Sequence, residues 1–247
     1  MPVETLGDDL VLLAIRPNGV IAEPGMLRYG LAGSELVRLA ALGRVDIQHG
    51  RIVVLESAPT GDVLLDEALA SMYRDWQAPT AQEWVADGRR DLVRRYLERL
   101  AAAGTIQLKR RKAPERAPVS GWTVVDAGRL AVARARLDAV AYGTGGVDMA
   151  HAALAGLTAA IGLQRFIYRG FSGSAARGRI THAAFSTGST ADAVVCAVTD
   201  ATDAAVQASI GAAAQAAISA ATQAAASATA HAAHHAAHGG GHGGGHH

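Results

Sequence analysis

The sequence predicts a mainly helical globular protein that carries one or two small β-hairpins. Half of its 247 residues are hydrophobic, which a packed core requires, although only 4% are aromatic. Apolar residues recur at helical spacing in several segments, and alternating apolar residues flank a short turn at Gln48-His49-Gly50. These observations exclude a wholly disordered chain.

The first elements are read from apolar patterns and turn residues. Leu10 to Ile15 is a short buried element that fits either a helix or a strand, and Pro17-Asn18-Gly19 predicts a turn after it. A helix is expected from Met26 to Leu42, with small residues that allow close packing. Arg44 to Glu56 then reads as a hairpin.

Capping residues indicate three later helices. We expect Thr60 to cap the first of them, with Asp62 in its first turn. Thr80 and Glu83 form a capping-box pattern, and Asp126 is placed to cap a further helix. Each of these side chains can accept a hydrogen bond from an otherwise unpaired backbone N–H.

The middle of the chain predicts a surface helix followed by a second hairpin. Strands are expected at 105–108 and 122–125, bridged by a basic, proline-containing segment, and a further helix at 149–168. The surface helix is marked by a stripe of apolar residues: Leu92, Val93, Tyr96, Leu97 and Leu100.

Composition divides the chain into three parts. Residues 1–190 form the predicted helical domain, 191–238 an alanine-rich helical extension, and 239–247 a disordered Gly/His tail. The core is therefore expected to come from the first two thirds of the chain.

Basic residues are concentrated in the middle of a chain whose net charge is only +1. Residues 89–116 hold ten basic and three acidic side chains. Such a surface fits an anionic membrane, while the alternatives are a solvated face paired with acids such as Asp91 and Glu98, or nucleic acid. The near-neutral total charge disfavours nucleic acid.

The sequence favours a cytoplasmic binding protein over an exported protein or an enzyme. Asp8 and Asp9 interrupt any amino-terminal export signal, no segment is apolar enough to span a membrane, and the single Cys196 fits a reducing compartment. No nucleophile elbow or phosphate-binding loop is found, so no catalytic residue, and no cofactor, is assigned.

Three segments carry a family resemblance. Gly30-Leu31-Ala32-Gly33, the run from Leu36 to Val45, and above all Ala58-Pro59-Thr60-Gly61-Asp62-Val63-Leu64-Leu65-Asp66-Glu67-Ala68-Leu69 resemble the Golgi phosphoprotein 3 family. Trp84 and the Gly104-Thr105-Ile106 ending match as well. The resemblance is clearest over residues 6–142.

The resemblance implies a helical bundle ringed by amphipathic helices, with a projecting hairpin. Eukaryotic members bind phosphatidylinositol 4-phosphate on membranes, use the hairpin for insertion or self-association, and hold cargo proteins. The Arg-, Ala- and Gly-rich composition suggests a bacterial member. We therefore expect a peripheral membrane adaptor, reversibly membrane-associated, with anionic lipid, a protein cargo and a second copy as partners.

The resemblance also implies where a lipid headgroup binds. The family's Trp falls near Glu23, its first Arg at Ala32, and its two later basic residues at Arg90 and Val93. Only Arg90 keeps its type. We expect neighbouring basic residues to complete the site, which gives the headgroup set Arg90, Arg89, Arg94 and Arg28.

The second hairpin supplies the expected membrane contacts. They are Lys109, Arg110, Arg111, Lys112 and, as an interfacial anchor, Trp122. Because these charges replace the apolar residues usual in the family's hairpin, surface contact is expected rather than insertion. A basic hairpin beside a helix is also typical of winged-helix proteins, which makes nucleic-acid binding the alternative function.

The tail contains histidines at helical spacing. His231, His234, His235 and His238 form pairs that can bind Zn, Ni or Cu. No carboxylate accompanies them, so adventitious metal binding by a low-complexity tail is the preferred interpretation.

Overall fold

The computed structural model describes residues 5–72, 79–87, 89–113, 116–183 and 192–204, with only the backbone described for 110–113 and 116–120. The chain divides into two compact units, Met1–Thr202 and Asp203–His247. All labelled elements belong to the first unit. The tail histidines and most of the alanine-rich segment lie outside the described residues.

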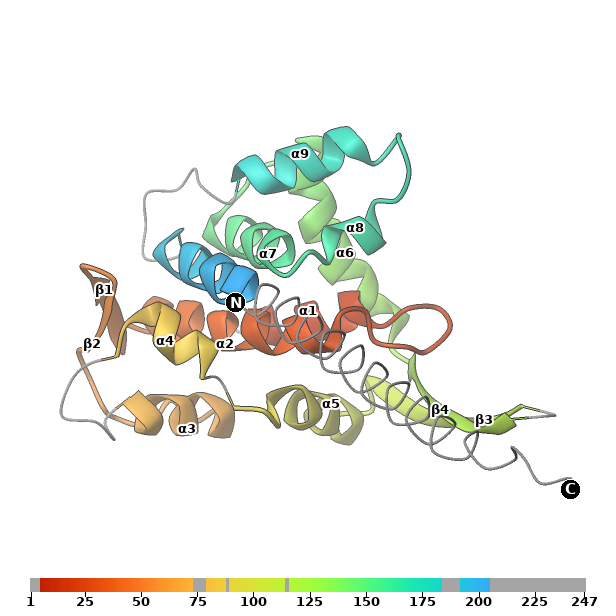
Figure 1. The fold of residues 1–247 in the computed structure, drawn as a ribbon, viewed down its shortest axis with the longest axis horizontal. Coiled ribbons are helices and arrows are strands. Elements are labelled where there is room, and N and C mark those ends of the chain that lie inside the picture. Colours follow the sequence, from red (N-terminus) through yellow and green to blue (C-terminus); the bar gives the residue numbers. More distant parts are fainter. Residues whose placement is uncertain (1–4, 73–78, 88, 114–115, 184–191, 205–247) are drawn as a thin grey trace, which may run out of the picture. The chain divides into compact units, whose positions relative to one another are not determined.

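The described part is mainly helical with two small antiparallel hairpins, as the sequence predicts (Figure 1). The strands are β1 (Val45–Gln48), β2 (Arg51–Val54), β3 (Ile106–Ala113) and β4 (Arg116–Val124). The helices are α1 (Leu6–Ala14), α2 (Pro24–Ala41), α3 (Val63–Met72), α4 (Ala81–Ala86), α5 (Leu92–Ala102), α6 (Ala127–Tyr142), α7 (Met149–Ala160), α8 (Gln164–Ile167) and α9 (Ser174–Ala183).

Helix α2 is the centre of the bundle. Every residue from Tyr29 to Leu39 is buried, and the helix packs against α1, α3, α4, α5, α7 and β1. Helices α6, α7 and α9 pack on one another, and α1 joins this group to α2 and α5. A helix enclosed in this way must bury its polar residues too, which brings Glu35 and Arg38 inside.

Small residues on α2 set how closely its neighbours approach. A Cβ on Gly33 would lie 2.5 Å from Val198 and 2.8 Å from Leu157, and one on Gly30 would lie 3.0 Å from Ile161. Residues 192–204 are helical, and Val198 within them is fully buried. The beginning of the alanine-rich segment, predicted as an extension, thus packs on the domain core.

Helix α5 shows the amphipathic pattern that the sequence predicts. Leu92, Tyr96, Leu97 and Leu100 are buried, while Val93 is half-buried. The opposite side carries arginines. This helix forms part of the outer layer around α2, which agrees with the expected bundle ringed by amphipathic helices.

Two predicted helix caps are confirmed, and one is wrong. Thr80 and Glu83 form the capping box of α4, and the Asp126 carboxylate accepts from the N–H of Arg129 at 3.0 Å. At α3, however, the Asp62 carboxylate accepts from the N–H of Leu64 at 2.9 Å. Thr60 lies too far upstream to cap, and its hydroxyl donates to Asp66 instead.

The second hairpin is longer than predicted. Strands β3 and β4 pair through the basic segment, for example at Lys109 with Gly121 and at Arg111 with Val119. The proline at position 118 is compatible with this pairing because both strands of a two-stranded ribbon are edges, where an outward-facing N–H is dispensable. The basic segment expected to connect the two strands is therefore itself part of the paired strands β3 and β4.

The helix predicted over 149–168 is interrupted. Helix α7 ends at Ala160, and Gly162 adopts a positive φ of 71°. The N–H of Leu163 donates back to the carbonyl of Thr158 at 3.0 Å, which closes the helix end. The chain turns there and continues as the short helix α8.

We predict that Gly33→Ala destabilises the protein by about 1–3 kcal/mol, because the added methyl group overlaps Val198 and Leu157. Gly25→Ala on the same helix is the matched control. Nothing lies within 4 Å of a Cβ there, so stability should be unchanged or rise by about 0.5 kcal/mol. Urea unfolding compares the two variants, and equal effects would contradict the close packing of α2.

Candidate functional site

Of the five arginines in the basic segment whose side chains the structure describes, four are paired with carboxylates and only Arg90 is not. Arg89 bonds Glu35 at 2.5 Å and Glu67 at 2.9 Å, and Arg95 bonds Glu67 at 2.7 Å. Arg99 bonds Asp8 and, at 3.2 Å, Asp62. The middle arginines therefore hold helices together instead of forming one free positive surface.

Glu35 is the most deeply buried carboxylate of this network. Its side chain is fully buried on α2, and burial raises its pKa to about 7 although the charge and hydrogen bond of Arg89 oppose this shift. One of its oxygens, Oε2, has no hydrogen-bond partner among the described residues. Arg89 is thus the cation that favours the ionised form of a core carboxyl, and its predicted headgroup role competes with this pairing.

Asp62 is the second centre of the ionic network. It accepts from Arg38 at 2.6 Å and from Arg99 at 3.2 Å, besides capping α3. Partial burial opposes its ionisation, but the hydrogen bond and charge of Arg38, with the charge of Arg99, lower the pKa of the carboxyl. Helices α2, α3 and α5 are joined at this one side chain.

The other predicted headgroup residues have different surroundings. Arg90 is exposed and forms no ion pair or hydrogen bond with the residues that the structure describes. Arg94 bonds Glu98 at 2.7 Å and Asp91 at 3.3 Å on the exposed side of α5. Arg28 stacks on the ring of its neighbour Tyr29 at 4.4 Å. No residue described by the structure contacts all four arginines of the predicted headgroup set.

The positions at which the family resemblance places the headgroup ligands cannot jointly bind one phosphate group either. Ala32 is buried inside α2, and Val93 is half-buried on α5. Glu23 is exposed beside Pro24 and carries a negative charge. Of the implied positions, Arg90 alone offers a cation.

The base of the second hairpin lies beside the loop between α1 and α2. Lys109 is exposed and Trp122 is half-buried, whereas the side chains of Arg110, Arg111 and Lys112 lie outside the described residues. The N–H of Trp122 donates to the carbonyl of Gly19 at 2.9 Å. This bond attaches the base of the hairpin to the α1–α2 loop.

A pocket that the sequence did not predict lies against the α1–α2 loop, at residues such as Arg16 and Pro17. It has a volume of about 440 Å³, and its floor is apolar. Three arginines line it, Arg16 from the loop, Arg134 from α6 and Arg169 after α8, and no carboxylate does. The apolar lining residues are Leu12, Leu13, Ile15, Pro17, Ala22, Leu130, Phe166 and Ile167.

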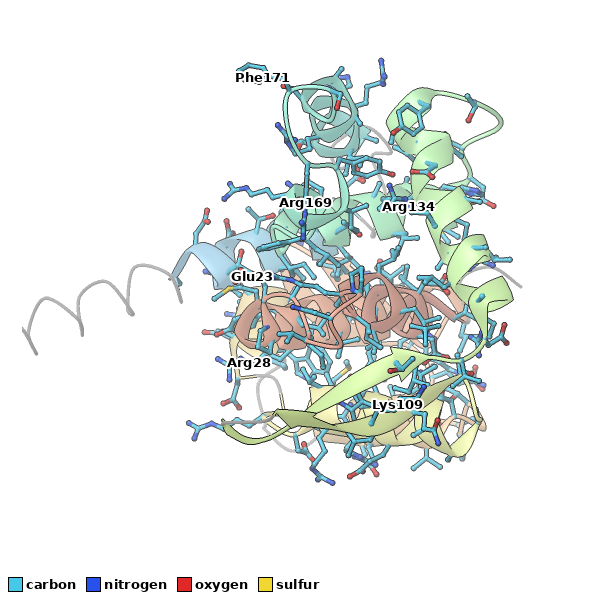
Figure 2. All side chains as sticks on the ribbon, turned by 90° about the vertical axis from the view of Figure 1, so that its right-hand side faces the viewer. Glu23, Arg28, Lys109, Arg134, Arg169 and Phe171 are labelled. Carbon is cyan, nitrogen blue, oxygen red and sulfur yellow. The ribbon has the colours of Figure 1, made fainter. Side chains whose placement is uncertain are left out.

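Each of the three arginines is held in place by its own contacts. Arg16 lies over the ring of Phe166 at 4.2 Å. Arg134 donates through Nε to Asp138 at 3.1 Å and lies over the ring of Tyr168, and Arg169 donates through Nε to the Phe166 carbonyl at 3.2 Å. Their terminal NH groups form no bond with the described residues. Figure 2 shows Arg134 and Arg169 above the two central helices and Lys109 below them.

A second pocket, of about 550 Å³, lies beside the ionic network and is lined by both carboxylates and arginines: Asp62, Glu98, Arg95 and Arg99. Within the described residues, no three His, Cys, Asp or Glu side chains are grouped to hold a metal ion. The predicted metal ligands His231, His234, His235 and His238 lie outside that part of the chain. Among the helices described, none combines the length and the apolar character needed to cross a membrane.

The fold is a helical bundle with a projecting hairpin and an arginine-lined pocket. The family model of Golgi phosphoprotein 3 (GPP34) matches residues 6–205, and the chain belongs to this family. The match extends past Tyr142 to include the helical residues 192–202 that pack on α2. A search of curated proteins found no match.

We predict that Arg89→Ala destabilises the fold by about 3 kcal/mol, since it leaves the buried carboxylate of Glu35 without its cation. Arg94→Ala is the control, because its pairs are exposed and should contribute about 0.5 kcal/mol at most. Chemical denaturation measures both. A loss for Arg89→Ala as small as that of Arg94→Ala would contradict the structural role of Arg89.

Glu35 should also make stability depend on pH. Folding raises its pKa from an ordinary 4.5 to about 7, so the folded state binds more protons than the unfolded chain in this window. The free energy of unfolding should therefore fall as pH rises from about 5 to about 7. Comparing wild type with Glu35→Gln across this range isolates the effect, and parallel curves would contradict it.

Proposed function

We propose that this protein is a peripheral membrane adaptor that associates reversibly with anionic lipid on the cytoplasmic side of a membrane. Membership of the Golgi phosphoprotein 3 family supports this function. Negative charge is the proposed basis of recognition, with phosphatidylinositol 4-phosphate as one such lipid, because only Arg90 among the family-implied positions is a cation. A protein cargo would bind the adaptor, and no catalytic step is proposed.

The observation that carries this proposal is that three exposed loops, which include a basic and an aromatic side chain, lie on one side of the domain. The β3–β4 hairpin, the α1–α2 loop and the α8–α9 connection all lie on the right-hand side of Figure 1. Lys109 is exposed on the hairpin, and Phe171 in the α8–α9 connection is fully exposed. Lys109 and Phe171 lie at opposite ends of this side of the domain (Figure 2), and an exposed cation and an exposed aromatic ring each suit the interface between lipid headgroups and acyl chains.

The magnitudes favour reversible surface binding. A Lys or Arg near an anionic leaflet contributes about 1 kcal/mol, and this contribution falls with salt because the charges are screened. The four basic hairpin residues Lys109, Arg110, Arg111 and Lys112 would then supply about 4 kcal/mol. That is enough for an association that changes in lipid charge or ionic strength can reverse.

We predict that the full-length protein floats with phosphatidylcholine vesicles that contain phosphatidylglycerol, but not with phosphatidylcholine alone, and that added salt releases it. A mobility-shift assay with duplex DNA over the same salt series tests the nucleic-acid alternative. Binding to DNA without flotation would overturn the membrane proposal.

Charge reversal at two places locates the contact. Lys109→Glu with Arg110→Glu should weaken flotation roughly tenfold or more, because two attractions become repulsions. Arg90→Glu with Arg94→Glu changes the charge equally at the start of α5 and should have a smaller effect. If the second pair abolishes binding while the first does not, the contact lies at α5, as the headgroup set predicted from the sequence requires.

A further inference from the structure

The membrane contact proposed for the hairpin does not use the pocket between the α1–α2 loop, α6 and α8. We propose that it binds a single phosphorylated amphiphile, with the phosphate on Arg16, Arg134 and Arg169 and the apolar part on the pocket floor. The inference deepens the proposed function and rests on it in one respect: the membrane would deliver the ligand.

Charge complementarity points to a phosphate. Three arginines line one cavity, and no carboxylate is among its lining residues. Asp138 neutralises part of one charge through Nε of Arg134, which leaves the terminal NH groups of all three arginines open. A phosphate monoester offers several acceptor oxygens, each of which can take a charge-assisted hydrogen bond from such a group.

An unsatisfied donor lies at the same place. Nε of Arg16 is buried and has no hydrogen-bond partner in the part of the chain that the structure describes. Leaving a buried donor unpaired is unfavourable, and a ligand oxygen in the pocket would pair it. The exposed arginines on the outer side of α5 lack this feature.

The arginines are ordered before any ligand arrives. The Phe166 ring supports Arg16, Asp138 and the Tyr168 ring hold Arg134, and the Phe166 carbonyl holds Arg169. A side chain that is already fixed loses little conformational entropy when it binds a ligand. The contacts use Nε atoms and ring faces, so the terminal NH groups stay available.

The apolar floor distinguishes an amphiphile from inorganic phosphate. Apolar side chains such as Leu12, Leu130 and Ile167 line the cavity together with the arginines, and its volume of about 440 Å³ exceeds what a phosphate group needs. Glycerol and acyl carbons of a lipid could bury apolar surface there. Inorganic phosphate would gain nothing from these contacts.

The test uses the full chain and soluble short-chain lipids. Dihexanoyl phosphatidic acid, kept below its micelle concentration, is titrated calorimetrically and compared with inorganic phosphate and dihexanoyl phosphatidylcholine. Arg134→Gln and Arg169→Gln should each weaken phosphatidic acid binding roughly tenfold or more. Arg165→Gln is the matched control, since Arg165 is exposed on α8 and does not line the pocket.

A spectroscopic readout separates pocket binding from general attraction. Nitrogen NMR of the arginine Nε–H groups should show the Arg16 signal shifting on addition of phosphatidic acid, while the Arg165 signal stays in place. Equal weakening by Arg165→Gln, or equal affinity for inorganic phosphate or phosphatidylcholine, would overturn the proposal. Unchanged thermal unfolding of the variants shows that any loss is not a loss of fold.

The two proposals can fail separately. Soluble phosphatidic acid binding without flotation on anionic vesicles would refute the membrane proposal and support the pocket. Flotation without binding of the soluble lipid would refute the pocket and support the membrane proposal. The variant Lys109→Glu with Arg110→Glu should lose flotation while it keeps its affinity for soluble phosphatidic acid.

Discussion

The buried carboxyl group of Glu35 constrains the whole bundle, because its charged form is stable in a core only with a cation beside it. Arg89 supplies that cation from the segment before α5, and Glu67 on α3 joins the same arginine. Asp62 makes a similar junction with Arg38 and Arg99. The outer helices are thereby oriented on α2 by charge as well as by apolar packing.

This constraint explains why a basic segment of sequence is not a basic surface. Arginines that pair with Glu35, Glu67 and Asp62 contribute little field outside the protein. Among the described residues, cations that remain open include Arg90 just before α5, Lys109 on the hairpin and the arginines around the pocket. The proposed membrane contact therefore depends on the loops at one side of the domain, where no core carboxylate competes for the charge.

The sequence could predict features that depend on neighbouring residues. The capping box at Thr80 and Glu83, the cap at Asp126 and the apolar stripe of α5 all follow from local spacing, and all are confirmed. The element at Leu10 stayed ambiguous between helix and strand. It is helical and buried on nearly every side, and an element with no polar face has no periodicity to read.

Local patterns alone determined the helical class, the caps of α4 and α6 and the approximate position of both hairpins, because backbone hydrogen bonds and turn residues act over a few positions. Only the tertiary structure decided which arginines are neutralised and which remain open. Arg89 meets Glu35 across 54 positions, and Arg16, Arg134 and Arg169 come from three separate segments. Ion pairs and pockets form between side chains that are close in space, and the separation of two residues along the chain does not predict whether they are close in space.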